Sequence, residues 1–518
     1  MENEYAETRA NDQVSSWLWL GIGILLFAFS NGRWVIPLAA WLAPVFLLRF
    51  VRLQKPLAGL IVLFLAITLS ARVMLYGIVP SLLGILTYLL IIYYALLWFL
   101  PYLVARLFSR KLPSFAVTLF FPLTAVAIEY LNTTALGSWG AIAYTQFGNL
   151  PLLQVMSVTG MWGVTFLVMW FGSLVNWVWE KRLDWSQVRG GIITYASILT
   201  AVMLLGGARL ATSPAQASSV RVASFTAAQQ IEQFYQGMGK KGYDSSIKMA
   251  DRDRNTLHEL LSTMHESMFE RTKHEIAGGA SIVLWPEGAT RVLQEDEPKF
   301  LARGCEVARS GQAYLLLAYF VVPRETPWLL GENKSVFITP AGDVKWHYLK
   351  THPVPGATDK PGLGIVPISD TPFGRIASVI CYDMDFTNLV NQAGKASADI
   401  MLVPAWDWRA IDPLHTVMAT FRAIENGFSM VRQSGEGLSI AVDYQGKVLA
   451  SMDYYTAKDQ HMTAQVPTKG TRTVYSYIGD TFAWLCLVCL LLLSAISLWG
   501  RLQFIAPEIS KSTWIKGE

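Results

Sequence analysis

The chain carries little charge for its length. Only 15% of its 518 residues are Asp, Glu, Lys or Arg, whereas soluble globular domains average about 25%. Hydrophobic residues make up 53% of the sequence, and the mean hydropathy is positive. This composition excludes intrinsic disorder and an ordinary soluble globule, and it favours a membrane protein.

Cysteine and basic clusters are also scarce. Four cysteines are too few and too scattered for a disulfide framework, and no His/Cys group has the spacing of zinc ligands. A formal net charge of +4 without a dense Lys/Arg tract gives no support for nucleic-acid binding. No Gly-rich phosphate loop follows a strand. We therefore expect no metal, no nucleotide cofactor and no nucleic-acid partner.

Charge is distributed unevenly along the chain. Residues 1–209 contain 20 charged side chains, residues 210–480 contain 55, and residues 481–518 contain 5. The sequence therefore predicts a membrane domain over 1–209, a soluble domain over 210–480, and a final span with a short tail over 481–518. Eight apolar runs are expected to cross about 30 Å of hydrocarbon. They lie near residues 15–30, 34–50, 57–76, 81–105, 113–130, 160–179, 190–208 and 481–500.

The loops between these runs differ in basic residues, which indicates an orientation. Twelve Lys and Arg follow spans two, four, six and eight, whereas the opposite connections between spans offer only Arg33 and Arg72. We expect both termini in the cytoplasm and residues 210–480 outside it. No small-residue cleavage signature follows the first span, which favours an uncleaved anchor. Glu129, at the outer end of span five, is expected at the membrane interface.

In the middle of the chain, the pattern of apolar residues changes. Short apolar runs rich in β-branched residues alternate with helical stretches over 251–277 and 298–310, which indicates an α/β sandwich with strands covered on both faces. The expected strands cover residues 220–225, 281–285, 313–321, 335–339, 376–381, 400–404, 428–432 and 438–442.

Three side chains of this domain lie at strand ends or in adjoining loops, where catalytic residues are often placed. They are Glu287, Lys350 and Cys381. A thiol is a good nucleophile at neutral pH, a carboxylate can accept its proton, and an ammonium can stabilise both a thiolate and an oxyanion. Together these groups suffice for acyl transfer. Taken singly, each residue is more often a buried small side chain or a solvated charge.

The surrounding motifs make the combination specific. Trp285-Pro286-Glu287, Lys350-Thr351-His352 and Cys381-Tyr382-Asp383 occur in the order typical of the nitrilase, or carbon-nitrogen hydrolase, superfamily, which the domain resembles. The resemblance implies an αββα sandwich. It also implies a Glu-Lys-Cys triad, in which Lys350 and the backbone N–H of Tyr382 hold the oxyanion.

The arrangement of seven spans, an external nitrilase-like domain and one span resembles the apolipoprotein N-acyltransferase family. Segments starting at Gly137, Tyr144, Pro151 and Gly160 look like that family's membrane signature. The resemblance implies a bacterial inner-membrane enzyme. Cys381 would take an acyl chain from a phospholipid, usually phosphatidylethanolamine, as a thioester. The α-amine of a lipoprotein's N-terminal diacylglyceryl-cysteine would then receive it. A monomer is favoured.

Two positions depart from the family pattern. The chain has Asp359 near the place where the family has a second glutamate, one position displaced, and Asp383 where the family usually has Glu after Cys-Tyr. Asp359 and Asp383 are therefore candidate supporting residues, as is His352, which is expected to line or shape the pocket rather than act as a base. Loops that exclude water would protect a thioester. Candidates to cover the pocket are Trp328, Trp406 and Trp408.

Two other functions stay open. One is a membrane-anchored amide hydrolase, or an acyltransferase with another amine acceptor. The other is a lipid-binding scaffold with an inactive nitrilase-like domain, although the three intact residues Glu287, Lys350 and Cys381 argue against it.

Overall fold

The computed structural model describes residues 2–79, 84–108, 115–212, 218–324 and 331–512. The chain forms two compact units. One contains Met1–Arg209 and Asp480–Glu518, and the other contains Leu210–Gly479. The first unit is helical, and the second combines helices with two β-sheets.

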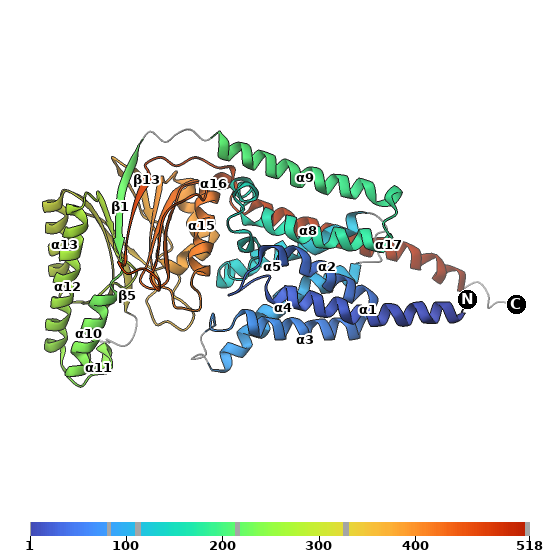
Figure 1. Ribbon diagram of the computed structural model, residues 1–518, viewed down its shortest axis with the longest axis horizontal. Coiled ribbons are helices and arrows are strands. Elements are labelled where there is room, and N and C mark those ends of the chain that lie inside the picture. The colour runs from blue at the N-terminus through green and yellow to red at the C-terminus, as the bar shows by residue number, and fades with distance from the viewer. Residues whose placement is uncertain (1, 80–83, 109–114, 213–217, 325–330, 513–518) are drawn as a thin grey trace. The chain divides into compact units, whose positions relative to one another are not determined.

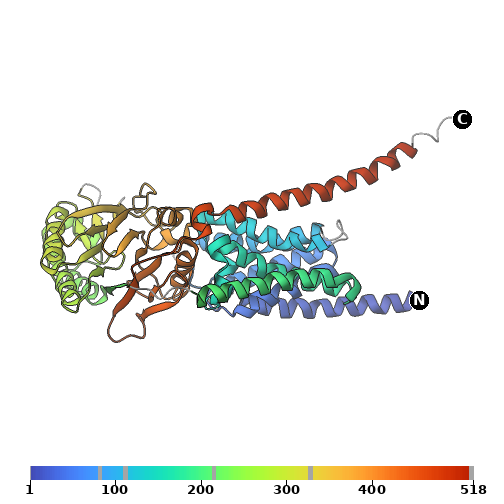
Figure 2. The same ribbon diagram turned by 90° about the horizontal axis from the view of Figure 1, so that it is seen from above.

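The helical unit contains long apolar helices that lie side by side in both views (Figure 1, Figure 2). Prolines at the first position begin α2 and α3, where the missing N–H costs no helical hydrogen bond. The helices are α1 (Glu2–Ala28), α2 (Pro37–Leu53), α3 (Pro56–Met74), α4 (Ile85–Phe108), α5 (Phe120–Leu136), α6 (Leu150–Leu153), α7 (Met156–Thr159), α8 (Met161–Glu180), α9 (Trp185–Ala211) and α17 (Thr481–Ser512), with 3-10 turns η2 (Phe115–Leu119) and η3 (Ile142–Gln146).

Among the described residues, six helices are long and apolar enough to cross a membrane. They coincide with the last six of the eight expected spans. The first two expected spans coincide with α1, whose apolar part Ser15–Ala28 is short, and with α2, which has 17 residues. At 1.5 Å per residue, 17 residues span about 25 Å, less than the hydrocarbon core. The expectation of a polytopic helical domain is confirmed.

The basic ends of α2 and α4 lie together with the end of α8. Arg52 at the end of α2 forms an ion pair with Glu180 at the end of α8, with 2.9 Å between Nη1 and Oε1. Arg106 near the end of α4 donates to the carbonyl of Gln54, at 3.1 Å. The basic residues after expected spans two and four therefore gather with the end of span six at one end of the helical unit.

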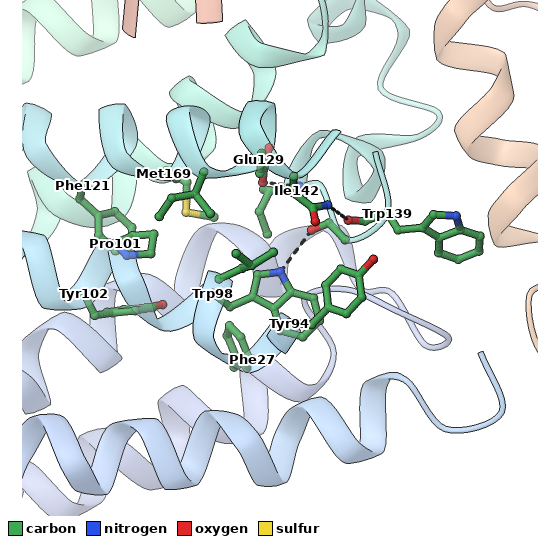
Figure 3. A pocket seen from close by; sticks show the side chains of 15 residues that line it. Phe27, Tyr94, Trp98, Pro101, Tyr102, Phe121, Glu129, Trp139, Ile142 and Met169 are labelled. Carbon is green, nitrogen blue, oxygen red and sulfur yellow. Dashed lines mark hydrogen bonds between the residues drawn. The ribbon is translucent and has the colours of Figure 1, made fainter. Parts of the chain in front are cut away.

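Glu129 has partners within this unit. Its Oε1 accepts a hydrogen bond from the backbone N–H of Ile142 at 2.9 Å, and its Oε2 accepts one from the Thr165 hydroxyl at 2.7 Å. Glu129 also lines a pocket with Trp98 and Tyr94 of α4 (Figure 3). These two hydrogen bonds stabilise a carboxylate among apolar helices, and they tie η3 to α5 and α8.

The second unit contains two sheets. The first has the order β13-β1-β2-β4-β5-β6 with β3 beside β4, and the second has the order β12-β11-β10-β9-β8-β7. Strands β1, β2 and β4 are parallel neighbours, as are β8, β9 and β10. The strands are β1 (Ser219–Phe225), β2 (Ile282–Leu284), β3 (Arg291–Leu293), β4 (Tyr314–Val322), β5 (Glu332–Ile338), β6 (Val344–Leu349), β7 (Ile368–Thr371), β8 (Gly374–Ser378), β9 (Ile400–Ala405), β10 (Ser429–Ser434), β11 (Leu438–Val442), β12 (Val448–Asp453) and β13 (His461–Pro467).

Helices cover the outer faces of both sheets. Figure 1 shows α12 and α13 on one side of the strands and α15 on the other. Asp253 caps α12 by accepting the N–H of Thr256. The helices are α10 (Ala228–Lys240), α11 (Ser246–Arg252), α12 (Arg254–Ala277), α13 (Glu297–Gly311), α14 (Thr387–Lys395), α15 (Leu414–Asn426) and α16 (Val474–Ile478), with the 3-10 turn η4 (Cys381–Asp385).

The core lies in two layers. Between the sheets, Leu284 and Phe337 of the first sheet pack with Ile400 and Val431 of the second. A second cluster lies under α12 and α13 and includes the fully buried ring of Trp285. Because apolar side chains fill both faces of the central strands, this structure confirms the expected αββα sandwich.

We expect Glu129→Leu to destabilise the protein, because it leaves the Ile142 N–H and the Thr165 hydroxyl without their acceptor. An unsatisfied buried polar group costs about 1–3 kcal/mol. The melting temperature of the full-length protein in detergent should fall by several degrees. Glu129→Gln, which keeps one acceptor oxygen, should cause a smaller fall. A melting temperature of the leucine variant equal to that of the wild type would contradict this role.

Candidate active site

The candidate site lies where strands of the two sheets end. Because the central strands run parallel within each sheet, the residues that follow β2, β8 and β9 come to one edge of the sandwich. The backbone N–H of Glu287, three residues after β2, donates to the carbonyl of Ala405 at the end of β9, at 3.3 Å. This bond joins the two sheets at the edge that carries the candidate residues.

Glu287 and Lys350 form a buried ion pair. Lys350 Nζ lies 2.6 Å from Glu287 Oε1, and the two residues are 2% and 7% exposed. Asn333 on β5 donates from Nδ2 to the same Oε1 at 2.8 Å. Burial works against the charge of Lys350, but Glu287 and Cys381 outweigh it and raise the pKa of the lysine. Lys350 therefore stays positively charged beside the carboxylate of Glu287.

Cys381 opens the η4 turn directly after β8, with a φ of +50° that few L-residues adopt. The thiol is buried, and it donates to the carbonyl oxygen of Trp406 across 3.6 Å. Burial, followed by the charge of Glu287, raises the pKa of this thiol, while Lys350 and His415 lower it. The thiol is therefore protonated at neutral pH and needs a base to become a nucleophile.

Asp383 holds the nucleophile turn against the lysine loop. Its carboxylate is fully buried and accepts the Tyr348 hydroxyl at 2.7 Å, the backbone N–H of His352 at 2.8 Å, and the backbone N–H groups of Thr351 and Ile380 at 3.3 Å. A carboxylate saturated by donors in this way is a structural anchor. It fixes Cys381, two residues before it, relative to Lys350.

Asp359 lies beside the ion pair. Its Oδ2 accepts from Asn333 Nδ2 at 3.3 Å, so one amide group contacts both Asp359 and Glu287. Burial raises the pKa of Asp359, and Glu287 adds to this effect, while Asn333 and Lys350 oppose it. The structure thus places a second carboxylate next to Glu287. The sequence did not single out Asn333. Its role depends on its contacts with Glu287 and Asp359, which the sequence alone does not reveal.

A second charged cluster adjoins the thiol. His415 on α15 lies 2.7 Å from Asp407 Oδ1 through Nδ1 and 3.3 Å from Asp385 Oδ2 through Nε2. Arg432 on β10 binds both oxygens of Asp407, at 2.7 and 3.0 Å. All four side chains are buried. None of the four is among the candidate site residues named from the sequence, because four separate segments supply them.

Among the described residues, one group has the spacing of metal ligands. Ligand atoms of Cys381, Asp407 and His415 lie within 4.8 Å of one another. Arg432 already occupies both oxygens of Asp407, and its positive charge at this place opposes a metal cation. The group is therefore better suited to hydrogen bonding with the thiol than to holding a metal.

The remaining predicted residues surround Cys381 at different depths. Tyr382 is buried and meets the Phe386 ring edge to face, while the half-buried ring of His352 stacks on Phe386. Trp406 contacts the thiol through its carbonyl, and its half-buried ring leaves no space for a side chain at Gly435. Trp408 is also half-buried. Trp328 lies outside the described residues.

Comparison with protein families agrees with both units. Residues 21–174 match the apolipoprotein N-acyltransferase N-terminal domain, and residues 226–474 match the carbon-nitrogen hydrolase family. An amidase from Nesterenkonia sp. covers 49% of this chain and 93% of its own, at 17% identity and a TM-score of 0.35, a likeness too low to support an argument.

Relatives extend over most of the chain. An apolipoprotein N-acyltransferase of Geobacter metallireducens is 24% identical over 458 residues, which are 82% of this chain and 82% of the relative. Apolipoprotein N-acyltransferase 1 of Treponema denticola is 24% identical over 77% of this chain and 80% of its own length. With one family model on each unit and relatives spanning both, the chain is similar to apolipoprotein N-acyltransferases over most of its length.

Proposed function

We propose that this protein is an apolipoprotein N-acyltransferase that works through a thioester on Cys381. It would transfer a fatty acyl chain from a phospholipid to the α-amine of the N-terminal diacylglyceryl-cysteine of a lipoprotein. The observation that carries the proposal is the buried Glu287–Lys350 ion pair, whose charges act on the Cys381 thiol, in a chain with full-length relatives of that name.

In the first half-reaction, Glu287 takes the proton of the Cys381 thiol, and the sulfur attacks an ester carbonyl of the phospholipid. The ammonium of Lys350, already paired with Glu287, is placed to stabilise the oxyanion of the tetrahedral intermediate. The C–O bond to the glycerol then breaks, and the leaving oxygen takes the proton from Glu287. The products are a lysophospholipid and an acyl thioester on Cys381.

In the second half-reaction, the lipoprotein's α-amine attacks the thioester carbonyl. Glu287 takes a proton from the attacking nitrogen, the C–S bond breaks, and the sulfur takes that proton back as the amide is released. One carboxylate thus serves as base and then as acid in both halves, which requires it to exchange a proton and not to remain a permanent anion.

Asp359 has a supporting role in this scheme. Asp359 and Glu287 both accept a hydrogen bond from the side-chain amide of Asn333. When Glu287 is protonated, the Asn333–Glu287 hydrogen bond weakens, and Asp359 keeps the amide oriented. A second carboxylate one position away from the family's glutamate can therefore fill the same place in this chain.

The membrane setting follows from the same proposal. The gathering of Arg52, Arg106 and Glu180 at one end of the helical unit supports an orientation with that end, and both termini, in the cytoplasm. The catalytic unit then faces the outer side of the inner membrane. The donor would be phosphatidylethanolamine, and the protein would act as a monomer.

Incubating the purified protein with phosphatidylethanolamine micelles, without an acceptor, should add the mass of one acyl chain. The adduct should be removed by hydroxylamine, because thioesters are cleaved by it, and it should map to Cys381. Intact-protein mass spectrometry checks this result. Cys305→Ala should retain the adduct, and Cys381→Ala should lose it. An unmodified wild-type protein with intact lipid would contradict the proposal.

Asp359→Ala should slow acyl-enzyme formation by about 10–100-fold, because loss of the Asn333 contact loosens the group that orients Glu287. Asp359→Glu should be slowed less. The measurement is the rate of adduct formation by intact mass, and Asp370→Ala, at an exposed aspartate, serves as the control. Equal rates for Asp359→Ala and the control would show that Asp359 has no supporting role.

A further inference from the structure

The charged cluster of Asp385, Asp407, His415 and Arg432 has no part in the mechanism above, although it lies next to the nucleophile. A ring nitrogen of His415 lies within 4.8 Å of the Cys381 sulfur. The same ring lies between two buried carboxylates, Asp385 and Asp407. A buried histidine placed in this way between carboxylates and a thiol requires a chemical explanation.

The charge balance of the cluster indicates the protonation state of His415. Two carboxylates and the guanidinium of Arg432 leave one negative charge uncompensated in a buried place, which is costly. An imidazolium at His415 makes the cluster neutral. Burial works to lower the pKa of His415, but Asp385 and Asp407 outweigh burial and raise it well above its usual value.

We propose that His415, held as an imidazolium between Asp385 and Asp407, stabilises the thiolate of Cys381 by its positive charge. Arg432 acts as a positioning residue, because it binds both oxygens of Asp407 and so orients the carboxylate that holds the ring. The role of this thiolate in acyl transfer rests on the proposed function, but the arrangement of the charged groups around the sulfur does not depend on a lipid.

The chemistry explains why a second cation is useful. Lys350 lies 2.6 Å from Glu287, so its charge is largely matched while Glu287 is ionised. In the second half-reaction the sulfur leaves the thioester as a thiolate, and it must be stabilised until it regains a proton. His415 lies within 4.8 Å of the sulfur, in a cluster that does not exchange protons with the substrates, so its charge can stabilise the thiolate in both half-reactions.

The test is the pH dependence of Cys381 alkylation by iodoacetamide, followed by peptide mass spectrometry in the full-length protein. The groups that act on the sulfur are Glu287, Lys350 and the cluster around His415. His415→Gln keeps a hydrogen-bond donor but loses the charge. It should move the midpoint of the alkylation profile upward by about 1–3 pH units, the usual effect of an opposite charge at this range.

His258→Gln is the matched control, because His258 also pairs with an aspartate, Asp296, but on the partly exposed surface of α12. Its alkylation midpoint should equal that of the wild type. An unchanged midpoint in a folded His415→Gln protein would overturn the proposal and leave His415 with a packing role only. Melting curves of both variants show whether they are folded.

A second variant keeps the test decisive if His415→Gln does not fold. Asp385→Asn retains the ring but removes one carboxylate that holds its charge, so the midpoint should move upward by a smaller amount. No upward shift in that variant would also overturn the proposal. Alkylation needs neither lipid nor acceptor. A shifted midpoint without any acyl adduct would therefore reject the proposed function and retain this inference.

Discussion

The ion pair between Lys350 and Glu287 is the interaction on which the catalytic unit depends. Two opposite charges, 2.6 Å apart and almost fully buried, are stable only if each also has hydrogen-bonding partners. Asn333 supplies one of these partners. The pair in turn requires that the ends of β2 and β6 be held together, because the two residues follow those strands.

The fold meets this requirement with buried carboxylates that anchor loops rather than react. Asp383 accepts backbone N–H groups on both sides of the site, so the lysine loop and the nucleophile turn move as one piece. Asp407 anchors Arg432 and His415 in the same way. Buried carboxylates of this kind lose some stability in exchange for a defined geometry.

The sequence was informative where one physical signal dominated. Apolar runs covered on both faces predicted β1, β2, β4 and β9, and the Glu, Lys and Cys motifs predicted residues that the structure gathers at one edge. The sequence did not predict β6 and β12, in which buried or half-buried side chains alternate with exposed ones. Six of the eight expected spans coincide with described helices that are long and apolar enough to cross a membrane. Asn333 and Asp385 act only through their neighbours in space, which one sequence cannot reveal.

The central claim is that Cys381 passes its acyl group to an amine rather than to water. A chase experiment tests it most directly. The acyl-enzyme is formed on labelled phosphatidylethanolamine, freed of lipid, and mixed with a diacylglyceryl-cysteine peptide that has a free α-amine. The account predicts that the label leaves Cys381 and appears as an amide on the peptide, and that an N-acetylated peptide leaves the thioester in place. Release of the label as free fatty acid at the same rate with either peptide would contradict it.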